Sequence, residues 1–264
     1  SELILGTLKI NRSDMSQLEF GVITSVAGGG QVDINYNTFT EMGLPVTILD
    51  ASQGTTILGN DINYNDTEAY LSNTGLGTTG VFVASTSNSP NTNGTIIKNN
   101  TFYDGGESSS GFRILLGQEN KRVNHKLIVS SNTFEGDRDN TEAVGISAID
   151  TRDGILAGNR FKSGSGAWVD LRNGDPNDGF LGQSVTGWAI VANTFSASLA
   201  GTDVVLASGT SGTVIGRGQG LPIIDDQTGT NDVLESSASS SSFYPVSAER
   251  FLRSLSNLRD EQAD

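Results

Sequence analysis

The sequence predicts an all-β fold, a right-handed parallel β-helix solenoid, from three observations. A short apolar run followed by Asn, one further residue and then Phe or Ile occurs six times. A second apolar run follows each copy after a gap rich in Gly, Asn, Asp and Ser, residues that favour turns. No helical periodicity appears before residue 245. Units that repeat in this way are typical of solenoids, in which each unit buries its apolar face against its neighbours.

The six asparagines that mark the repeat set its length. They lie 23, 40, 32, 27 and 34 residues apart, in the order Asn37, Asn60, Asn100, Asn132, Asn159 and Asn193. The second apolar runs cover residues 46–49, 81–84, 112–116, 144–149, 167–171 and 204–207. β-Branched residues are frequent in both kinds of run, as in short strands. We therefore expect each pair of runs to form one coil, with roughly six or seven coils in all.

The repeated asparagines have a structural role in this prediction. Coils of a β-helix stack about 4.8 Å apart, so equivalent side chains lie above one another. A column of Asn side chains can then form hydrogen bonds along the axis, each amide donating to the next carbonyl. An apolar column is expected inside the coils, formed by Phe39, Ile62, Phe102, Phe134, Phe161 and Phe195. None of these residues is expected to take part in chemistry.

Composition and charge narrow the possible functions. The chain has 264 residues, no Cys and a formal net charge of −14, and no Lys or Arg occurs between Ser13 and Ile97. This charge argues against nucleic acid as a partner, because affinity for phosphate chains comes largely from Lys and Arg. The sequence has no apolar run of about 18 residues, so no transmembrane helix is predicted. An acidic solenoid rich in Gly, Asn, Ser and Thr favours an extracellular or cell-surface location in a microbe.

The composition changes near the end of the chain. Residues 1–220 are predicted to form the β-helix, residues 221–242 a loop and Ser-rich linker, and residues 243–264 an amphipathic helix. An isolated helix of this length is marginal in water, so it needs a packing surface. It either packs on the solenoid or covers its end, or it docks a partner or a second copy of this chain through residues 246–258.

Alternation along three of the second runs predicts a polar outer surface. If Phe112, Ile114 and Val169 point inward, the residues next to them point outward. The expected outward set is Arg113, Ser147, Trp168, Asp170 and Arg172. An exposed Trp beside Arg and Asp offers a flat apolar face to a sugar ring and charged groups to its hydroxyls or carboxylate. The predicted substrate-binding residues are therefore Arg113, Trp168, Asp170, Arg172 and Asp175. The alternative is a solvated ladder of ion pairs between coils.

Candidate catalytic and metal-binding groups lie in the same region. Two carboxylates around a glycosidic bond can hydrolyse it, whereas a lyase needs a base that removes the proton next to a uronate carboxylate. The candidate catalytic residues are Asp150, Arg152, Asp170 and Arg172, with Asp175 and Lys126 as further candidates. Carboxylate-rich turns offer ligands for Ca²⁺ through Asp137, Asp139, Asp175 and Asp178. The single histidine, His125, is expected to lie at the surface or to cap a loop.

The recurring phrase of two apolar residues, two variable residues and Asn-Thr-Phe carries a family resemblance. It resembles the coils of the right-handed parallel β-helix superfamily, which includes pectate lyases, polygalacturonases, alginate lyases, alginate epimerases and phage tailspikes. Residues 111–117 and 188–195 are particularly similar to coils of the alginate lyase and chondroitinase branch. The resemblance implies the fold over roughly residues 1–220. The Gly-His-Gly element of polygalacturonases and the Asp-Pro-His-Glu element of alginate epimerases are absent from the chain.

These observations lead to three functional expectations. The leading one is a non-enzymatic extracellular β-helix that acts as a structural, adhesive or glycan-contacting surface module, since the structural repeats are intact and these motifs are absent. The alternative is a polysaccharide lyase, or a hydrolase, that acts on a uronate-containing polysaccharide. A weaker alternative is a receptor-binding fragment similar to a phage tailspike. The expected partners are a polysaccharide or a cell-surface assembly partner, and the only cofactor considered is Ca²⁺.

Overall fold

The structure, a computed structural model, describes the strands of the solenoid and part of the segments between them. The described residues are 7–18, 20–25, 30–49, 54–64, 79–84, 94–104, 112–117, 124–136, 144–162, 167–172, 185–196, 202–207, 209–216, 224–226 and 231–234. All of them belong to one compact unit, Ser1–Leu234. A second unit, Glu235–Asp264, lies outside the described residues. The predicted helix of residues 243–264 and its proposed docking role therefore lie outside them too.

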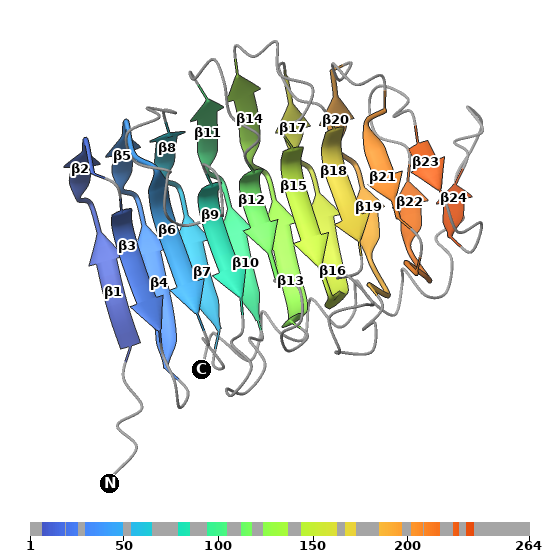
Figure 1. The fold of residues 1–264 in the computed structure, drawn as a ribbon, viewed down its shortest axis with the longest axis horizontal. Helices are drawn as coiled ribbons and strands as arrows, with labels where there is room; N and C mark the ends of the chain where they lie inside the picture. Colours follow the sequence, from blue (N-terminus) through green and yellow to red (C-terminus); the bar gives the residue numbers. More distant parts are fainter. Residues whose placement is uncertain are drawn as a thin grey trace, which may run out of the picture. The chain divides into compact units, whose positions relative to one another are not determined.

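The described strands form three parallel sheets (Figure 1). Sheet A has nine strands: β1 (Thr7–Asn11), β4 (Gln31–Asn35), β7 (Thr55–Leu58), β10 (Thr95–Lys98), β13 (Asn124–Ser130), β16 (Thr151–Ala157), β19 (Ala189–Val191), β22 (Val214–Gly216) and β24 (Asp232–Leu234). Sheet B has seven: β2 (Asp14–Ser16), β5 (Thr38–Thr40), β8 (Asp61–Tyr64), β11 (Thr101–Asp104), β14 (Thr133–Gly136), β17 (Arg160–Phe161) and β20 (Thr194–Phe195). Sheet C has eight: β3 (Phe20–Ser25), β6 (Leu44–Leu49), β9 (Thr79–Ala84), β12 (Phe112–Leu116), β15 (Val144–Ile149), β18 (Ala167–Arg172), β21 (Val204–Leu206) and β23 (Ile224–Asp226).

These sheets confirm the predicted parallel β-helix and correct the number of strands in each coil. A full coil contributes three strands, one to each sheet, and not the two that the sequence predicts. The difference arises because each repeated phrase divides at its asparagine. In the second coil β4 ends at Asn35 and β5 begins at Thr38, with Asn37 in the bend between them. Such a short bend interrupts the apolar run too briefly to give a separate signal in the sequence.

The six repeated asparagines form the predicted hydrogen-bonded column, which is buried. We call this column the Asn ladder; its members are Asn37, Asn60, Asn100, Asn132, Asn159 and Asn193. The Oδ1 atom of Asn132 accepts hydrogen bonds from the backbone N–H and the Nδ2 of Asn100, at 2.9 and 3.0 Å. Nδ2 of Asn100 also donates to the backbone oxygen of Ile57, at 2.9 Å. The same pattern joins the other members in turn. The ladder thus satisfies polar groups that the bend would otherwise leave buried without partners.

The bend between sheets A and B has the same backbone geometry in successive coils. The residue before each ladder asparagine has a positive φ, in the left-handed region. These residues are Tyr36, Gly59, Asn99, Ser131, Gly158 and Ala192, with φ from 54 to 65°. In the first coil Arg12, with a φ of 54°, takes this position, and the backbone N–H of Ser13 donates to Oδ1 of Asn37. Because every coil turns in the same way, equivalent residues stay in register.

Apolar columns fill the interior of the coils. The predicted column through sheet B is present and consists of Phe39, Ile62, Phe102, Phe134, Phe161 and Phe195. Its last four rings are stacked, with centroids 4.8 to 5.0 Å apart and planes within 11°. An aliphatic column runs through sheet A and consists of Ile10, Ile34, Ile57, Ile97, Val129, Leu156, Ile190 and Ile215. Each coil therefore buries its apolar side chains directly against those of its two neighbours.

The sheets continue beyond residue 220, where the sequence predicts that the β-helix ends. β23 pairs with β21, and β24 pairs with β22, both in parallel. These two strands of three residues follow no copy of the repeated asparagine phrase. The repeat, on which the prediction depended, therefore gave no sign of them.

Candidate functional site

Trp168, which the alternation pattern places on the outside, is fully buried in the core. Its ring centroid lies 5.3 Å from that of Phe161. Its Nε1 donates a hydrogen bond of 2.8 Å to the backbone oxygen of Ser196. The exposure predicted for Trp168 is therefore wrong, and a buried ring presents no face on which a sugar can stack.

Arg113, the second residue of the predicted sugar platform, is also fully buried. Its guanidinium carbon lies 5.4 Å from the centre of the Trp168 ring, the geometry of a cation–π contact. The two residues belong to β12 and β18, which are separated by β15. Gly145 on β15 has no side chain to separate them, and a Cβ added to it would lie 3.2 Å from Cε3 of Trp168. Arg113 and Trp168 therefore form an interior pair, and the outward position predicted for Arg113 is wrong.

A β-bulge in sheet C explains why alternation fails at these positions. The pairing of β15 with β18 omits Gly145 and Trp168. The N–H groups of Trp168 and Val169 both donate to the backbone oxygen of Asp203, at 3.0 Å each. Two consecutive donors that share one acceptor are typical of a bulge, which adds one residue and resets the alternation. Both Trp168 and Val169 consequently face the core.

The sequence contains a signal for this bulge that alternation alone does not use. The positions equivalent to Trp168 in earlier coils are held by Gly21, Pro45, Gly80, Arg113 and Gly145. Proline lacks an N–H for the strand ladder, and glycine is frequent where backbones approach closely. A Cβ added to Gly21 would lie only 2.4 Å from the oxygen of Pro45. Gly or Pro at the second position of four of these six strands thus indicates a break in the alternation.

Asp170 and Arg172 form an ion pair on the outer face of sheet C. The Arg172 side chain is 44% exposed, whereas that of Asp170 is only 5% exposed. Ser147, the neighbour of Asp170 on β15, is fully buried. The outward set predicted from the sequence is therefore reduced to one substantially exposed side chain, that of Arg172.

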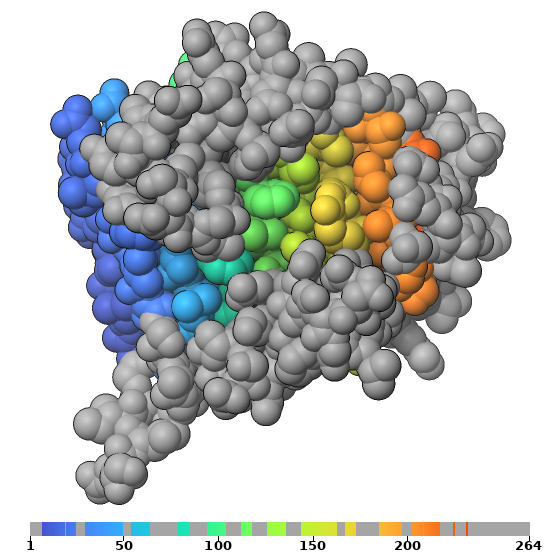
Figure 2. Space-filling view, in the orientation of Figure 1, coloured from blue at the N-terminus to red at the C-terminus, as the bar shows by residue number. Residues whose placement is uncertain are grey.

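The rest of this outer face is largely apolar. Phe82, Leu115 and Ile149 form a small buried cluster there with Ala84, and Phe112 packs against it. The prediction that Phe112 points inward is thus wrong, again because the bulge lies next to it. Figure 2 shows surface that passes from blue through green and yellow to orange, so successive coils lie side by side in chain order.

Asp150 and Arg152 lie at the junction between sheets C and A. Asp150 has a φ of 49° and is buried. Its backbone N–H approaches the backbone oxygen of Arg172, at 3.4 Å. Arg152 is half-buried on β16. The structure thus brings Asp150 next to the strand that carries Asp170 and Arg172, whereas Arg152 belongs to the neighbouring sheet.

The predicted Ca²⁺ ligands Asp137, Asp139, Asp175 and Asp178 lie outside the described residues. The side chain of His125 does so as well. Lys126 is exposed and has a φ of 54°. In the described ranges, no three His, Cys, Asp or Glu side chains gather closely enough to hold a metal ion. Calcium binding therefore stays a prediction, as does a substrate contact by Asp175.

A hollow that the sequence did not predict lies at the bend of the first two coils. We call it the Tyr36 hollow; it has a volume of about 330 Å³ and is lined by Asn11, Arg12, Asn35 and Tyr36. Asn11 and Asn35 are register partners on β1 and β4. The Tyr36 ring lies against Gly59 in the next coil, since a Cβ added there would lie 2.7 Å from Cδ1 and Cε1. The only sequence signal is a Tyr at a bend position where later coils have Gly, Asn, Ser or Ala.

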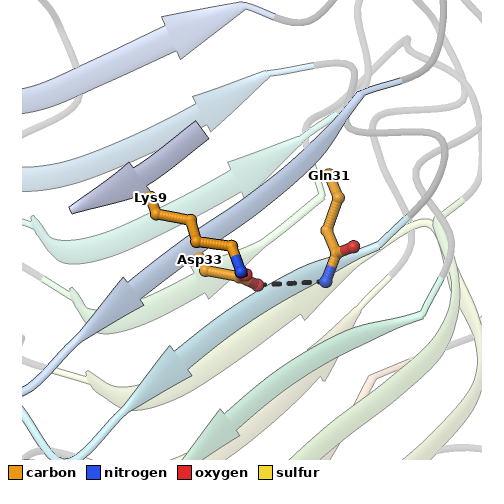
Figure 3. Close-up of polar contacts among 3 residues, drawn as sticks. All are labelled: Lys9, Gln31 and Asp33. Atoms are coloured by element: carbon orange, nitrogen blue, oxygen red, sulfur yellow. Dashed lines mark hydrogen bonds and ion pairs between the residues drawn. The ribbon is translucent and has the colours of Figure 1, made fainter. Parts of the chain in front are cut away.

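Polar side chains continue from the Tyr36 hollow along the same two strands. Nε2 of Gln31 donates to Oδ1 of Asp33 at 3.1 Å, and both residues belong to β4 (Figure 3). Nζ of Lys9, on β1, lies 3.9 Å from Oδ2 of Asp33. Lys9 is thus paired with Asp33, whereas Arg12 lies at the hollow itself.

The chain matches no protein-family model, no curated protein and no solved structure. Within the described ranges, the structure contains no helix of the length and apolar character needed to cross a membrane. The function therefore has to be argued from the geometry of the site and from the chemistry of its side chains.

Proposed function

We propose that this chain is a non-enzymatic β-helix module of an extracellular or cell-surface assembly, in which it acts as a rigid structural, adhesive or glycan-contacting element. The observation that supports the proposal is the burial of Arg113 and Trp168. Two of the three largest side chains of the predicted sugar platform are packed in the core as a cation–π pair. The outer face of sheet C is left with an ion pair and an apolar cluster.

The interior of the coils suits a rigid module. Each step along the Asn ladder adds hydrogen bonds between coils to those of the three sheets. Sliding one coil against the next would break these bonds and unstack the phenylalanines at the same time. The nine strands of sheet A, at about 4.8 Å per step, span on the order of 40 Å. An element of this kind holds two attachment points at a fixed distance.

A polysaccharide lyase, or a hydrolase, is the alternative function. The observation in its favour is the Asp170–Arg172 ion pair, with the buried oxygens Oδ1 of Asp170 and Oγ of Ser147 on adjacent strands. A lyase base must accept a proton, however, and arginine keeps its proton in proteins. Arg172 is therefore poorly suited to act as the base.

Activity assays separate these two functions. The protein is incubated with alginate, pectin and chondroitin, while ultraviolet absorbance reports unsaturated products and a reducing-end assay reports hydrolysis. We expect neither signal to exceed the buffer control, while a pectate lyase provides the positive control on pectin. Product that is lost in Arg172→Ala but kept in Arg160→Ala, a change at an exposed arginine on β17, would establish the enzyme and refute the proposal.

The weaker alternative, a receptor-binding fragment similar to a phage tailspike, requires trimers. Size-exclusion chromatography with light scattering measures the mass of the full chain and of a variant that ends before residue 243. A trimeric mass favours this alternative. A fall in the number of chains per particle on truncation supports self-association through residues 246–258, and an unchanged number removes that idea.

A further inference from the structure

We infer that the Tyr36 hollow binds one pyranose ring of a neutral glycan. The inference rests on the proposed glycan contact and states where on the molecule that contact occurs. The four lining residues offer an aromatic ring, two carboxamides and a guanidinium. Its volume of about 330 Å³ is at the lower end of the range for small-molecule sites, as a single sugar ring requires.

The lining residues have unused hydrogen-bonding capacity. Oδ1 of Asn35 is buried and has no hydrogen-bond partner. Such an oxygen is unfavourable until a donor reaches it, and a sugar hydroxyl can do so once the Asn35 side chain turns toward the hollow. Among the described residues, the side chains of Asn11, Arg12 and Tyr36 form no hydrogen bond or ion pair. Donors and acceptors thus meet at one place without satisfying one another, which is the arrangement expected of a polar binding site.

Tyr36 is held as a platform. Its ring contacts Gly59 on the side of the next coil, yet the residue is 58% exposed. Its φ of 57° places a bulky side chain in the left-handed region, where such residues are uncommon. The following bends use Gly, Asn, Ser or Ala at the same position. A fixed aromatic face beside amide groups is suited to stack on a sugar ring while the amides bind its hydroxyls.

The charge of the chain favours a neutral sugar. Residues 13–97 contain eight Asp and Glu residues and no Lys or Arg. Of the two basic residues before this segment, Lys9 is paired with Asp33. The whole chain has a net charge of −14, so a polyanionic glycan is repelled on approach. Arg12 then acts as a hydrogen-bond donor to hydroxyl groups and not as the partner of a uronate carboxylate.

Later coils supply substitutions that the fold already accepts. Tyr36→Ala introduces the residue that Ala192 provides at the same bend, with a φ of 54°. Asn35→Leu introduces the residue of its register partner Leu58. Tyr103→Ala is the matched control, because Tyr103 is 40% exposed on β11 and does not line the hollow. Circular dichroism and thermal unfolding confirm that each variant is folded.

Binding is measured with neutral oligosaccharides of glucose, mannose, galactose and N-acetylglucosamine, and with alginate and pectin oligosaccharides for comparison. Saturation-transfer NMR detects binding, and titration calorimetry gives the affinity. We expect the full chain to bind at least one neutral sugar, with affinity reduced about tenfold or more by Tyr36→Ala and by Asn35→Leu. The change caused by Tyr103→Ala is expected to stay within about twofold.

The other outcomes separate the inference from the proposed function. Glycan binding that Tyr36→Ala and Asn35→Leu leave unchanged refutes the hollow as the site and keeps the glycan contact. Binding of acidic oligosaccharides alone refutes the assignment to a neutral sugar. Absence of binding to every glycan refutes the inference and removes glycan contact from the proposed function, while the rigid structural role stands until the activity assays contradict it.

Discussion

The guanidinium carbon of Arg113 lies 5.4 Å from the centre of the Trp168 ring, although a complete coil separates their strands. The contact is possible because Gly145, in the intervening coil, has no side chain. Both partners are fully buried. A charged group in the interior is tolerated only where neighbouring groups compensate its lost hydration, and the face of an indole contributes to that. The pair therefore ties three successive coils together at one corner.

Gly145→Val is expected to lower the free energy of unfolding by about 2 to 3 kcal/mol, because the new side chain overpacks the Trp168 ring. A Cβ alone would lie 2.6 Å from the backbone oxygen of Trp168. Denaturation in urea, followed by tryptophan fluorescence, measures the loss. Gly158→Ala is the control, since its Cβ would meet nothing closer than 3.9 Å and Ala192 adopts the same bend. Equal losses in the two variants would contradict the role of Gly145.

Gly154→Ala is expected to destabilise the protein by at least about 2 kcal/mol, because its Cβ would enter the space of the Trp188 ring. The added atom would lie 2.3 Å from Cδ2 and Cε2 of Trp188, which is fully buried. A shift of Trp188 would also strain its 3.1 Å hydrogen bond to Oγ1 of Thr151. Thermal unfolding by circular dichroism tests the effect. An unchanged midpoint would show that the contact between Gly154 and the Trp188 ring is loosely packed.

Asn100→Ala is expected to lower the free energy of unfolding by about 3 kcal/mol, whereas Asn99→Ala changes it by less than about 1 kcal/mol. The first change removes donors to Ile57 and Asn132 from a buried position. The second affects an exposed residue at a bend where Ala192 already occurs. Chemical denaturation of the two variants side by side gives the comparison. Similar losses would mean that the Asn ladder contributes little to stability.

Phe134→Ala is expected to destabilise the protein by about 3 to 5 kcal/mol, because it leaves a cavity between two stacked rings. The Phe134 centroid lies 5.0 Å from that of Phe102 and 4.8 Å from that of Phe161. Phe134→Ile should cost clearly less, since Ile62 occupies the same column. Urea denaturation of both variants measures the difference. An Ile variant as unstable as the Ala variant would contradict simple filling of the column.

Lys9→Ala is expected to change the free energy of unfolding by less than about 0.5 kcal/mol. The Lys9 side chain is 63% exposed, and its Nζ lies 3.9 Å from Oδ2 of Asp33. Water and salt screen an exposed pair of this kind. Denaturation at low and high ionic strength checks the value. A loss above about 1 kcal/mol would show that the pair contributes more than its exposure indicates.

The interior columns were predictable from the sequence because stacked coils turn repetition into contact. Six asparagines at similar places in six phrases can pair with one another along the axis, and the structure confirms this for Asn100 and Asn132. The phenylalanine column follows from the same register. The third strand of each coil was missed, because a bend of two residues hardly alters an apolar run.

The candidate site was predicted less well, because a side chain's direction depends on every residue of the strand before it. The bulge placed Arg113 and Trp168 inside and Phe112 outside, whereas Ile114 and Val169 face the core as predicted. Pro45, Gly80 and Gly145 marked the bulge, but only once their strands were aligned. The Tyr36 hollow could not be predicted at all, since it depends on the distance between side chains of two coils.

The sequence by itself determined the period of this protein, the parallel stacking of its coils and the identity of the columns in its core, because these depend on equivalent residues recurring at equivalent positions. Only the tertiary structure decided which polar and aromatic side chains reach the surface. Whether Arg113 is a surface group or a buried one depends on the space left by Gly145 and on the ring of Trp168. Those residues come from different coils, and their proximity is a property of the packed solenoid and not of any one segment.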